Sequence, residues 1–166
     1  MVDADFLALY QKTRDAVYTI ARRYLKGTDA ALDAAQDVFL KVHDLQKKIL
    51  HEPDPVAYVC RMAVNRCIDI RRREARYTGL PFGFDRILGG RPRTEEKDEI
   101  DFLLSPLSDD QRTAVILKEI VGMSVEETAT VCQTDPGTVK SRLSRAREKM
   151  RETLERRERH DQRNTR

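Results

Sequence analysis

The chain has 166 residues, enough for one domain or two small ones, and it contains no tryptophan. Charged residues make up 36% of it, yet the formal net charge is only +3. This excludes a global polycation, so nucleic-acid binding would have to use local basic surfaces. Abundant Ala, Leu, Arg, Glu, Lys and Asp favour helix over strand, so we expect an all-α protein.

Apolar residues at spacings of three and four, from Phe6 to Leu25 and from Leu32 to Leu45, predict two helices near the start of the chain. Gly27 is expected to end the first helix, because glycine is the usual residue just past a helix end. Thr28 or Asp29 is expected to cap the second.

A third helix is predicted over residues 56–76, started by Asp54 and Pro55. Its end is rich in arginine: Arg66, Arg71, Arg72, Arg73 and Arg76. This cluster indicates either a phosphate-binding patch or simply favourable charge at a helix C-terminus, worth under about 1 kcal/mol. Residues 1–76 form the first predicted lobe.

The periodic pattern fails after this helix, so residues 77–102 are interpreted as a flexible linker. Four apolar side chains make it too apolar for a pure spacer, and we expect them to dock in a complex: Phe82, Phe84, Ile87 and Leu88. The Arg/Glu-rich tail, residues 156–166, is expected to be solvated and disordered.

The second predicted lobe, residues 103–155, contains two capping boxes. In Ser108–Gln111 and Ser124–Glu127, the serine side chain can accept from a backbone N–H and the third residue can reach back. Helices should follow each box, the first ending at Gly122 and the second near Val131. Pro136 then starts a last helix.

A short capped helix, a tight turn and a longer helix form the helix-turn-helix arrangement. In the last helix, Val139, Leu143 and Ala146 should pack inward. The opposite side carries hydroxyl and cationic groups suited to base edges and phosphates: Thr138, Ser141, Arg142, Arg145 and Lys149. An ordinary solvated amphipathic helix would show the same spacing, and both interpretations stay open.

The remaining chemistry-bearing residues predict no catalytic, metal or cofactor site. Cys60, Cys67 and Cys132 form no CxxC pair and are interpreted as buried small residues. The chain lacks a Gly-rich phosphate loop and a nucleophile elbow. It also lacks a signal peptide pattern and an apolar run of membrane-spanning length, so we expect a cytoplasmic protein without membrane insertion.

Segments of both lobes resemble the sigma-70 family of RNA polymerase sigma factors, in its extracytoplasmic-function (ECF) group. Residues 30–39 (AALDAAQDVF) resemble region 2.2 and residues 58–73 resemble regions 2.3 and 2.4. Residues 104–133 are similar to region 4, and 137–147 (GTVKSRLSRAR) resemble its recognition helix. The order of the motifs, with a linker between them, also matches that group.

The resemblance implies roles for three sets of residues. The set that matches the helix docking on the coiled coil of the polymerase β′ subunit is Asp33, Gln36, Asp37, Val38 and Phe39. The set expected to melt and bind the downstream (−10) element is Asn65, Asp69, Arg72, Arg73 and Arg76. The set expected to read the upstream (−35) element is Thr138, Lys140, Ser141, Arg142 and Arg145.

Three positions depart from the family pattern. Leu32 stands where relatives usually have Glu, while His43 and Tyr58 stand where they often have Trp. Tyr58 keeps an aromatic surface and His43 does not. Leu32 therefore replaces one expected polymerase contact, and His43 replaces an expected aromatic surface.

The sequence therefore predicts a transcription initiation factor that binds core polymerase through the β′ coiled coil and β flap, and directs it to promoter DNA. The family implies control by an anti-sigma factor. The alternatives are a stand-alone helix-turn-helix regulator and a sigma-like adaptor that sequesters another regulator.

Overall fold

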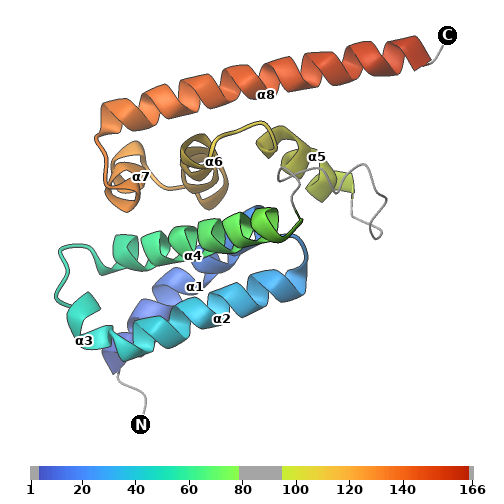
Figure 1. Ribbon diagram of the computed structural model, residues 1–166. Coiled ribbons are helices and arrows are strands. Elements are labelled where there is room, and N and C mark those ends of the chain that lie inside the picture. Colours follow the sequence, from blue (N-terminus) through green and yellow to red (C-terminus); the bar gives the residue numbers. More distant parts are fainter. Residues whose placement is uncertain (1–3, 79–94, 165–166) are drawn as a thin grey trace.

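The structure is a computed structural model that describes residues 4–78 and 95–164. Every regular element in these two ranges is a helix, which confirms the all-α prediction. The helices form two layers of elements, with the longest helix lying across the outer surface of the second lobe (Figure 1). The apolar linker residues between 79 and 94 lie outside the described residues.

The first lobe is a helical bundle in which one helix packs against the two others of similar length. Its elements are α1 (Ala4–Tyr24), α2 (Thr28–Asp44), α3 (Gln46–Ile49) and α4 (Pro55–Thr78). Helix α1 contacts both α2 and α4, and the apolar stripe predicted from the sequence is buried between them. Val17, Ile20 and Val59 are fully buried in this core.

Backbone geometry explains where the helices of this lobe begin. The Asp54 carboxylate accepts a hydrogen bond from the Ala57 N–H at 2.9 Å, so the predicted cap ahead of Pro55 is confirmed. The predicted cap by Thr28 or Asp29 is wrong. Gly27, at φ +90°, occupies the cap position, which places Thr28 already inside α2.

The second lobe contains α5 (Glu95–Leu104), α6 (Asp109–Val115), η2 (Ile116–Val121), α7 (Val125–Cys132) and α8 (Pro136–Asn164). Both capping boxes are present, because Ser108 and Ser124 accept from the N–H three residues on and that residue's side chain reaches back. Element η2 is a turn of π-helix continuing α6, and it ends at Gly122 with φ +88° as expected.

Three boundaries differ from the sequence predictions. Helix α5 occupies residues 95–104, most of which were assigned to an irregular linker, and α4 continues two residues past Arg76. Helix α8 also continues through residues 156–164 of the tail that was expected to be disordered. An ion pair one turn apart, Arg156–Glu152 at 3.8 Å, favours this extension, and Arg157 lies over the ring of Phe102.

The two lobes pack directly against each other. Helix α1 contacts η2, and α4 contacts α7 (Figure 1). Buried apolar residues of both lobes, from Leu9 to Cys67 and from Leu104 to Ala146, form one continuous cluster. Small lobes bury too little surface to be very stable alone, and here each covers an apolar surface of the other.

Two positions with left-handed backbone predict opposite effects on stability. Gln133 has φ +52°, so Gln133→Gly should raise the free energy of unfolding by up to about 1 kcal/mol. Gly122 has φ +88° with open space where a Cβ would lie, so Gly122→Ala should lower it by about 1–2 kcal/mol through backbone strain alone. Urea denaturation measures both; equal shifts of one sign would contradict this account.

Candidate functional site

The helix-turn-helix predicted in the second lobe consists of α7, a turn at Gln133 and α8. The turn is closed by the Thr134 N–H, which donates to the Ala129 carbonyl at 3.0 Å. On α8, Val139, Leu143 and Ala146 are buried, as expected. Lys140, Ser141 and Arg145 are exposed on the helix surface, which leaves them available to a ligand.

Thr138 serves the start of α8. Asp135 accepts from the Thr138 backbone N–H at 2.9 Å and from its hydroxyl at 2.6 Å. These hydrogen bonds lower the pKa of the Asp135 carboxyl below its usual value. Thr138 thus fixes the N-terminus of the helix, where backbone N–H groups favour an anion such as a DNA phosphate.

Arg142 and Lys149, expected beside these residues, have partners inside the lobe. Arg142 donates to the Asp110 carboxylate at 2.9 Å, and its side chain is only 24% exposed. Lys149 donates to the Gln111 side chain at 3.0 Å. Of these two cations, Arg142 would have to leave a carboxylate before it could contact DNA.

The outer side of α4 collects the residues assigned to the downstream element. Asn65, Asp69, Arg72, Arg73 and Arg76 are all exposed there. A polar groove of about 610 Å³ between α2 and α4 is lined by Asn65 and Asp69. Four further lining residues are Asp37, Tyr58, Met62 and Arg66. The Arg66–Asp37 ion pair at 2.6 Å crosses between the two helices.

A second, more apolar groove of about 790 Å³ lies between α1 and α2. We call it the aromatic groove. Its floor is aromatic, with the rings of Tyr10 and Phe39 edge to face at 4.7 Å between centroids. Its rim includes Leu32, 51% exposed, and the predicted polymerase contact Gln36.

Two of the positions that depart from the expected family pattern, Leu32 and His43, line the aromatic groove. His43 lines it and packs edge-on to the ring of Phe6 at 5.2 Å. Leu32, where the family resemblance led us to expect Glu, makes part of its rim apolar. The sequence did not predict that α1 contributes to this groove, because the apolar residues of α1 fit the pattern of a helix side facing the core. The apolar stripe is wider than the buried side of α1, and this width was the one sign that part of it is exposed.

The predicted polymerase-binding residues do not all reach the surface. Asp33, Gln36 and Asp37 are exposed, and Phe39 is partly exposed in the aromatic groove. Val38 is 4% exposed and packs in the core of the bundle, so it offers no surface to a partner. The helical spacing of the apolar residues in α2 also predicts that Val38 faces the core.

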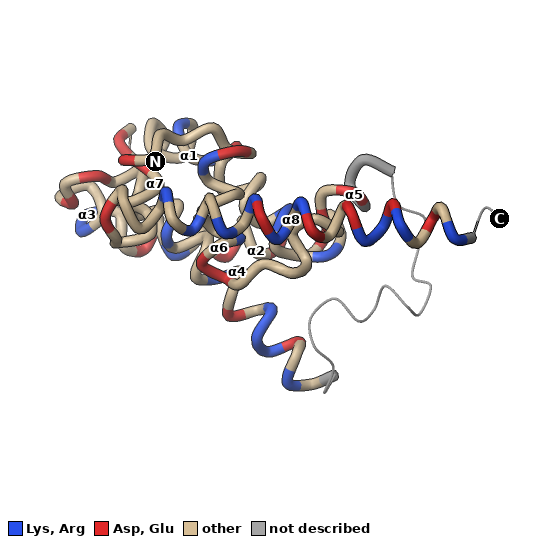
Figure 2. Tube along the Cα trace, turned by 90° about the horizontal axis from the view of Figure 1, so that it is seen from above, with Lys and Arg blue, Asp and Glu red and all other residues tan. Residues whose placement is uncertain are grey.

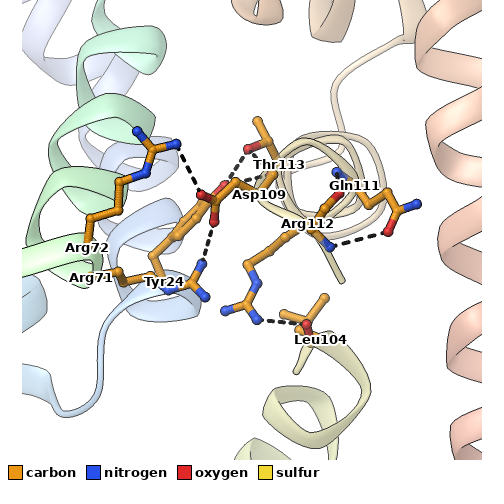
Figure 3. A network of polar contacts seen from close by, with 9 residues as sticks. Tyr24, Arg71, Arg72, Leu104, Asp109, Gln111, Arg112 and Thr113 are labelled. Atoms are coloured by element: carbon orange, nitrogen blue, oxygen red, sulfur yellow. Dashed lines mark hydrogen bonds and ion pairs between the residues drawn. The ribbon is translucent and has the colours of Figure 1, made fainter. Parts of the chain in front are cut away.

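A polar network between the lobes was not predicted. Arg71, only 8% exposed, donates from α4 to the Asp109 carboxylate of α6 at 3.1 Å, and Arg72 contacts the other oxygen at 3.5 Å (Figure 3). The buried Tyr24 hydroxyl contacts that of Thr113. Burial raises the pKa of Tyr24. The residues in contact are 37 to 89 positions apart in the sequence, so no local pattern marks them.

Arg112 is a second buried guanidinium beside this network. It donates to the Leu104 carbonyl at 2.8 Å (Figure 3). Burial lowers the pKa of Arg112 to about 10, and the nearby positive charge of Arg71 contributes to this decrease. Tyr24 and Asp109 act in the opposite direction and raise the pKa. Asp109 therefore supplies negative charge where two buried cations approach each other, and its loss should be costly.

Cys60 and Cys67 are buried as predicted, whereas Cys132, at the end of α7, is only partly buried. Cys60 and Cys67 are fully enclosed in the first lobe, and burial raises the pKa of each thiol from 9.0 to about 12. We predict that native protein at pH 8 protects both from alkylation until it unfolds, measured by mass spectrometry with urea. Because the unfolded thiols ionise first, stability should fall between pH 9 and 12. Rapid native labelling of Cys60 would contradict this.

The described residues contain no cluster of His, Cys, Asp or Glu that could hold a metal ion. None of the helices described is long and apolar enough to cross a membrane. The candidate site consists of three surfaces: the aromatic groove, the outer side of α4 and the exposed side of α8.

These features define a two-lobed helical protein with a DNA-binding type of helix-turn-helix. Comparison with known families identifies which family of DNA-binding proteins the chain matches. Residues 9–77 match "Sigma-70 region 2" and residues 97–150 match "Sigma-70, region 4". The chain belongs to the sigma-70 family of RNA polymerase sigma factors, in its ECF group.

Individual relatives agree. The chain is 27% identical to the ECF RNA polymerase sigma factor SigM of Mycobacterium tuberculosis, over 87% of this chain and 74% of SigM. It is also 27% identical to the RNA polymerase sigma-H factor of Pseudomonas aeruginosa, over 90% of this chain and 86% of that one.

Solved structures show the same fold. The sigma factor RpoE from Bartonella quintana, crystallised with the anti-sigma factor NepR, aligns with a TM-score of 0.71 at 26% identity, covering 92% of this chain and 98% of RpoE. CnrH, solved with the cytosolic domain of CnrY, aligns with a TM-score of 0.66 at 26% identity, covering 90% and 87%.

Proposed function

We propose that this ECF sigma factor binds core RNA polymerase through its first lobe and places both lobes on promoter DNA. The observation that carries this proposal is the separation of surfaces within one chain: an apolar groove on α1 and α2, and an exposed hydroxyl and cationic surface on α8. A partner protein suits the first and nucleic acid suits the second.

The aromatic groove is assigned to the β′ coiled coil of the polymerase. A partly exposed aromatic floor with polar residues at the rim is the composition of a protein-binding hot spot. Phe39 and Tyr10 would supply the apolar contact, and Asp33 and Gln36 would fix its orientation. The second lobe would meet the β flap.

The outer side of α4 is assigned to the −10 element. Arg72, Arg73 and Arg76 would neutralise phosphates, which adds salt-dependent affinity without sequence information. Asn65 and Asp69 would contact an unstacked base at the polar groove. Unstacking costs a few kcal/mol, which contacts to a displaced base can offset.

The exposed side of α8 is assigned to the −35 element in its duplex form. Lys140, Ser141 and Arg145 are the residues free to approach base edges in a major groove. The N-terminus of α8, fixed by Asp135 and Thr138, would meet a phosphate. Neither lobe has to bind DNA tightly alone, because attachment to one polymerase raises the effective concentration of each.

An anti-sigma factor is the proposed regulator. Both solved relatives quoted above were obtained with such a partner or with the cytosolic domain of a second protein. For this chain, we propose a protein that covers the aromatic groove and so competes with polymerase.

A mobility-shift assay separates this proposal from a stand-alone helix-turn-helix regulator. Labelled promoter fragments are incubated with the purified protein, with core polymerase, and with both. We expect a sequence-specific complex only when both are present. Tight specific binding by the protein alone would favour the regulator and overturn the sigma assignment.

A further inference from the structure

The last turns of α4 project beyond the body that the two lobes form (Figure 2). Arg71 is buried, whereas Arg72, Arg73, Arg76 and Tyr77 after it are exposed. This end of α4 is therefore open to a ligand, and it continues the surface assigned to the −10 element.

Tyr77 is the most exposed of the large apolar side chains in the part of the chain that the structure describes. Leu7, Leu32 and Leu40 are 46%, 51% and 60% exposed, and all three line the aromatic groove. Tyr77 is 92% exposed and lines neither that groove nor the polar groove. A ring this exposed gains free energy when it packs against another flat apolar surface.

Two exposed arginines neighbour Tyr77 on the helix surface. Arg76 follows Arg73 by three residues and Tyr77 follows it by four, which is the spacing of side chains that lie side by side on a helix. We call these three residues the arginine–tyrosine patch. The acidic residue between them in sequence, Glu74, attracts the buried cation Arg71. The patch therefore combines positive charge with an exposed aromatic ring.

We propose that the ring of Tyr77 stacks on an unpaired base of melted promoter DNA, while Arg73 and Arg76 contact the phosphates beside it. An aromatic ring next to cations suits single-stranded nucleic acid, because every base has a flat face and every nucleotide a phosphate. Bases stacked within a duplex offer only their edges. Tyr77 therefore favours the melted promoter over the paired one. The inference rests on the proposed function for the source of the unpaired strand.

The position of Tyr77 distinguishes this contact from the base contact assigned to the polar groove. Tyr77 follows Asn65, which lines that groove, by 12 residues of the same helix. At 1.5 Å per residue this is about 18 Å. A stacked strand advances about 3.4 Å per nucleotide, so the distance corresponds to about five nucleotides, and to fewer in an extended strand. The patch thus binds a second base, roughly three to five nucleotides from the first.

A purely structural explanation is that Tyr77 is an isolated surface residue and that the arginines only stabilise the C-terminal end of α4. That explanation does not require a planar ring. Tyr77→Phe keeps the ring and should bind DNA like wild type. Tyr77→Leu keeps apolar area without a planar face and should bind DNA like Tyr77→Ala. Because Tyr77 is exposed, thermal unfolding should be unchanged in all three variants.

Abasic scanning of the promoter by the polymerase complex tests the stacking directly. The fragments carry an unpaired −10 region, so that melting does not limit binding, and one base at a time is removed while its phosphate is kept. For wild type, removal of the base that Tyr77 contacts should weaken binding about 5- to 100-fold. Tyr77→Ala should show the same loss on the intact fragment and no further loss at that position. Identical abasic profiles for Tyr77→Ala and wild type would overturn the proposal.

Arg73→Gln is the matched control that removes charge from the patch and keeps the ring. It should weaken binding to every fragment by a similar factor and reduce the dependence of affinity on salt. Sensitivity to the abasic position should remain. If Arg73→Gln removes this sensitivity and Tyr77→Ala does not, the ring is not the contact and the proposal is wrong.

The free full-length chain provides a second measurement that does not depend on polymerase. At low salt it should bind a short single-stranded oligothymidylate weakly, and Tyr77→Ala should reduce this binding while Tyr77→Phe retains it. Equal binding by Tyr77→Ala and wild type, here and in the polymerase complex, would overturn this inference and leave the proposed function intact. Oligothymidylate binding that depends on Tyr77, in a chain that never associates with core polymerase, would support this inference and overturn the proposed function.

Discussion

Phe39→Ala is expected to weaken association with core polymerase by about 2 kcal/mol or more, roughly thirtyfold in Kd. Phe39 forms the floor of the aromatic groove with Tyr10, and truncation would remove the ring on which an apolar partner would pack. Biolayer interferometry with immobilised core polymerase, in the absence of DNA, measures the effect.

Two variants make this result specific. Phe39→Leu keeps much of the apolar bulk and should restore a large part of the binding. Tyr77→Ala removes an aromatic ring that is 92% exposed at the end of α4, away from the groove, and should leave Kd unchanged. Equal losses in Phe39→Ala and Tyr77→Ala would argue against the groove as the docking site, provided that thermal unfolding shows both folded.

Arg145→Ala is expected to cost about 1–3 kcal/mol in binding of the polymerase complex to a promoter with its −35 element, if the guanidinium reads a base. The sequence placed Arg142 in the same set as Arg145, but the structure separates the two arginines. Arg145 is exposed, whereas Arg142 must first leave Asp110. We therefore expect a smaller loss for Arg142→Ala.

Arg147→Ala is the matched control for charge on α8. Arg147 is 62% exposed and pairs with Glu119, but it lies outside the set assigned to DNA. It should reduce binding little and equally on promoters with and without an intact −35 element. Quantitative footprinting on both templates distinguishes base reading from phosphate contact. If Arg145→Ala weakens binding equally on the two templates, Arg145 does not specify sequence.

Local signals predicted most of the secondary structure and the α8 surface. Ser108, Ser124 and Asp54 fix helix starts through hydrogen bonds from N–H groups three positions on, and Gly122 ends η2 with left-handed backbone and an N–H bond to the Leu117 carbonyl. These roles depend on local spacing, so they are visible in the sequence. The inward packing of Val139 follows from helical spacing in the same way.

Features made by distant segments could not be predicted in this way. The aromatic groove requires α1 and α2 to meet along their outer edges, and the Arg71–Asp109 pair joins residues of different lobes. Alternating charges on the tail, visible along α8 in Figure 2, suit either a solvated coil or a helix with ion pairs. The tail continues a helix that is already formed, so it avoids the unfavourable nucleation step, and the helix with ion pairs is favoured over the coil.

Run-off transcription reconstituted from core polymerase and purified protein, across genomic promoter fragments, tests the central claim most directly. The account predicts discrete transcripts from a restricted set of fragments only when the protein is added, and their loss with Phe39→Ala. Core polymerase that produces the same transcripts without the protein, or never associates with it, would contradict the assignment.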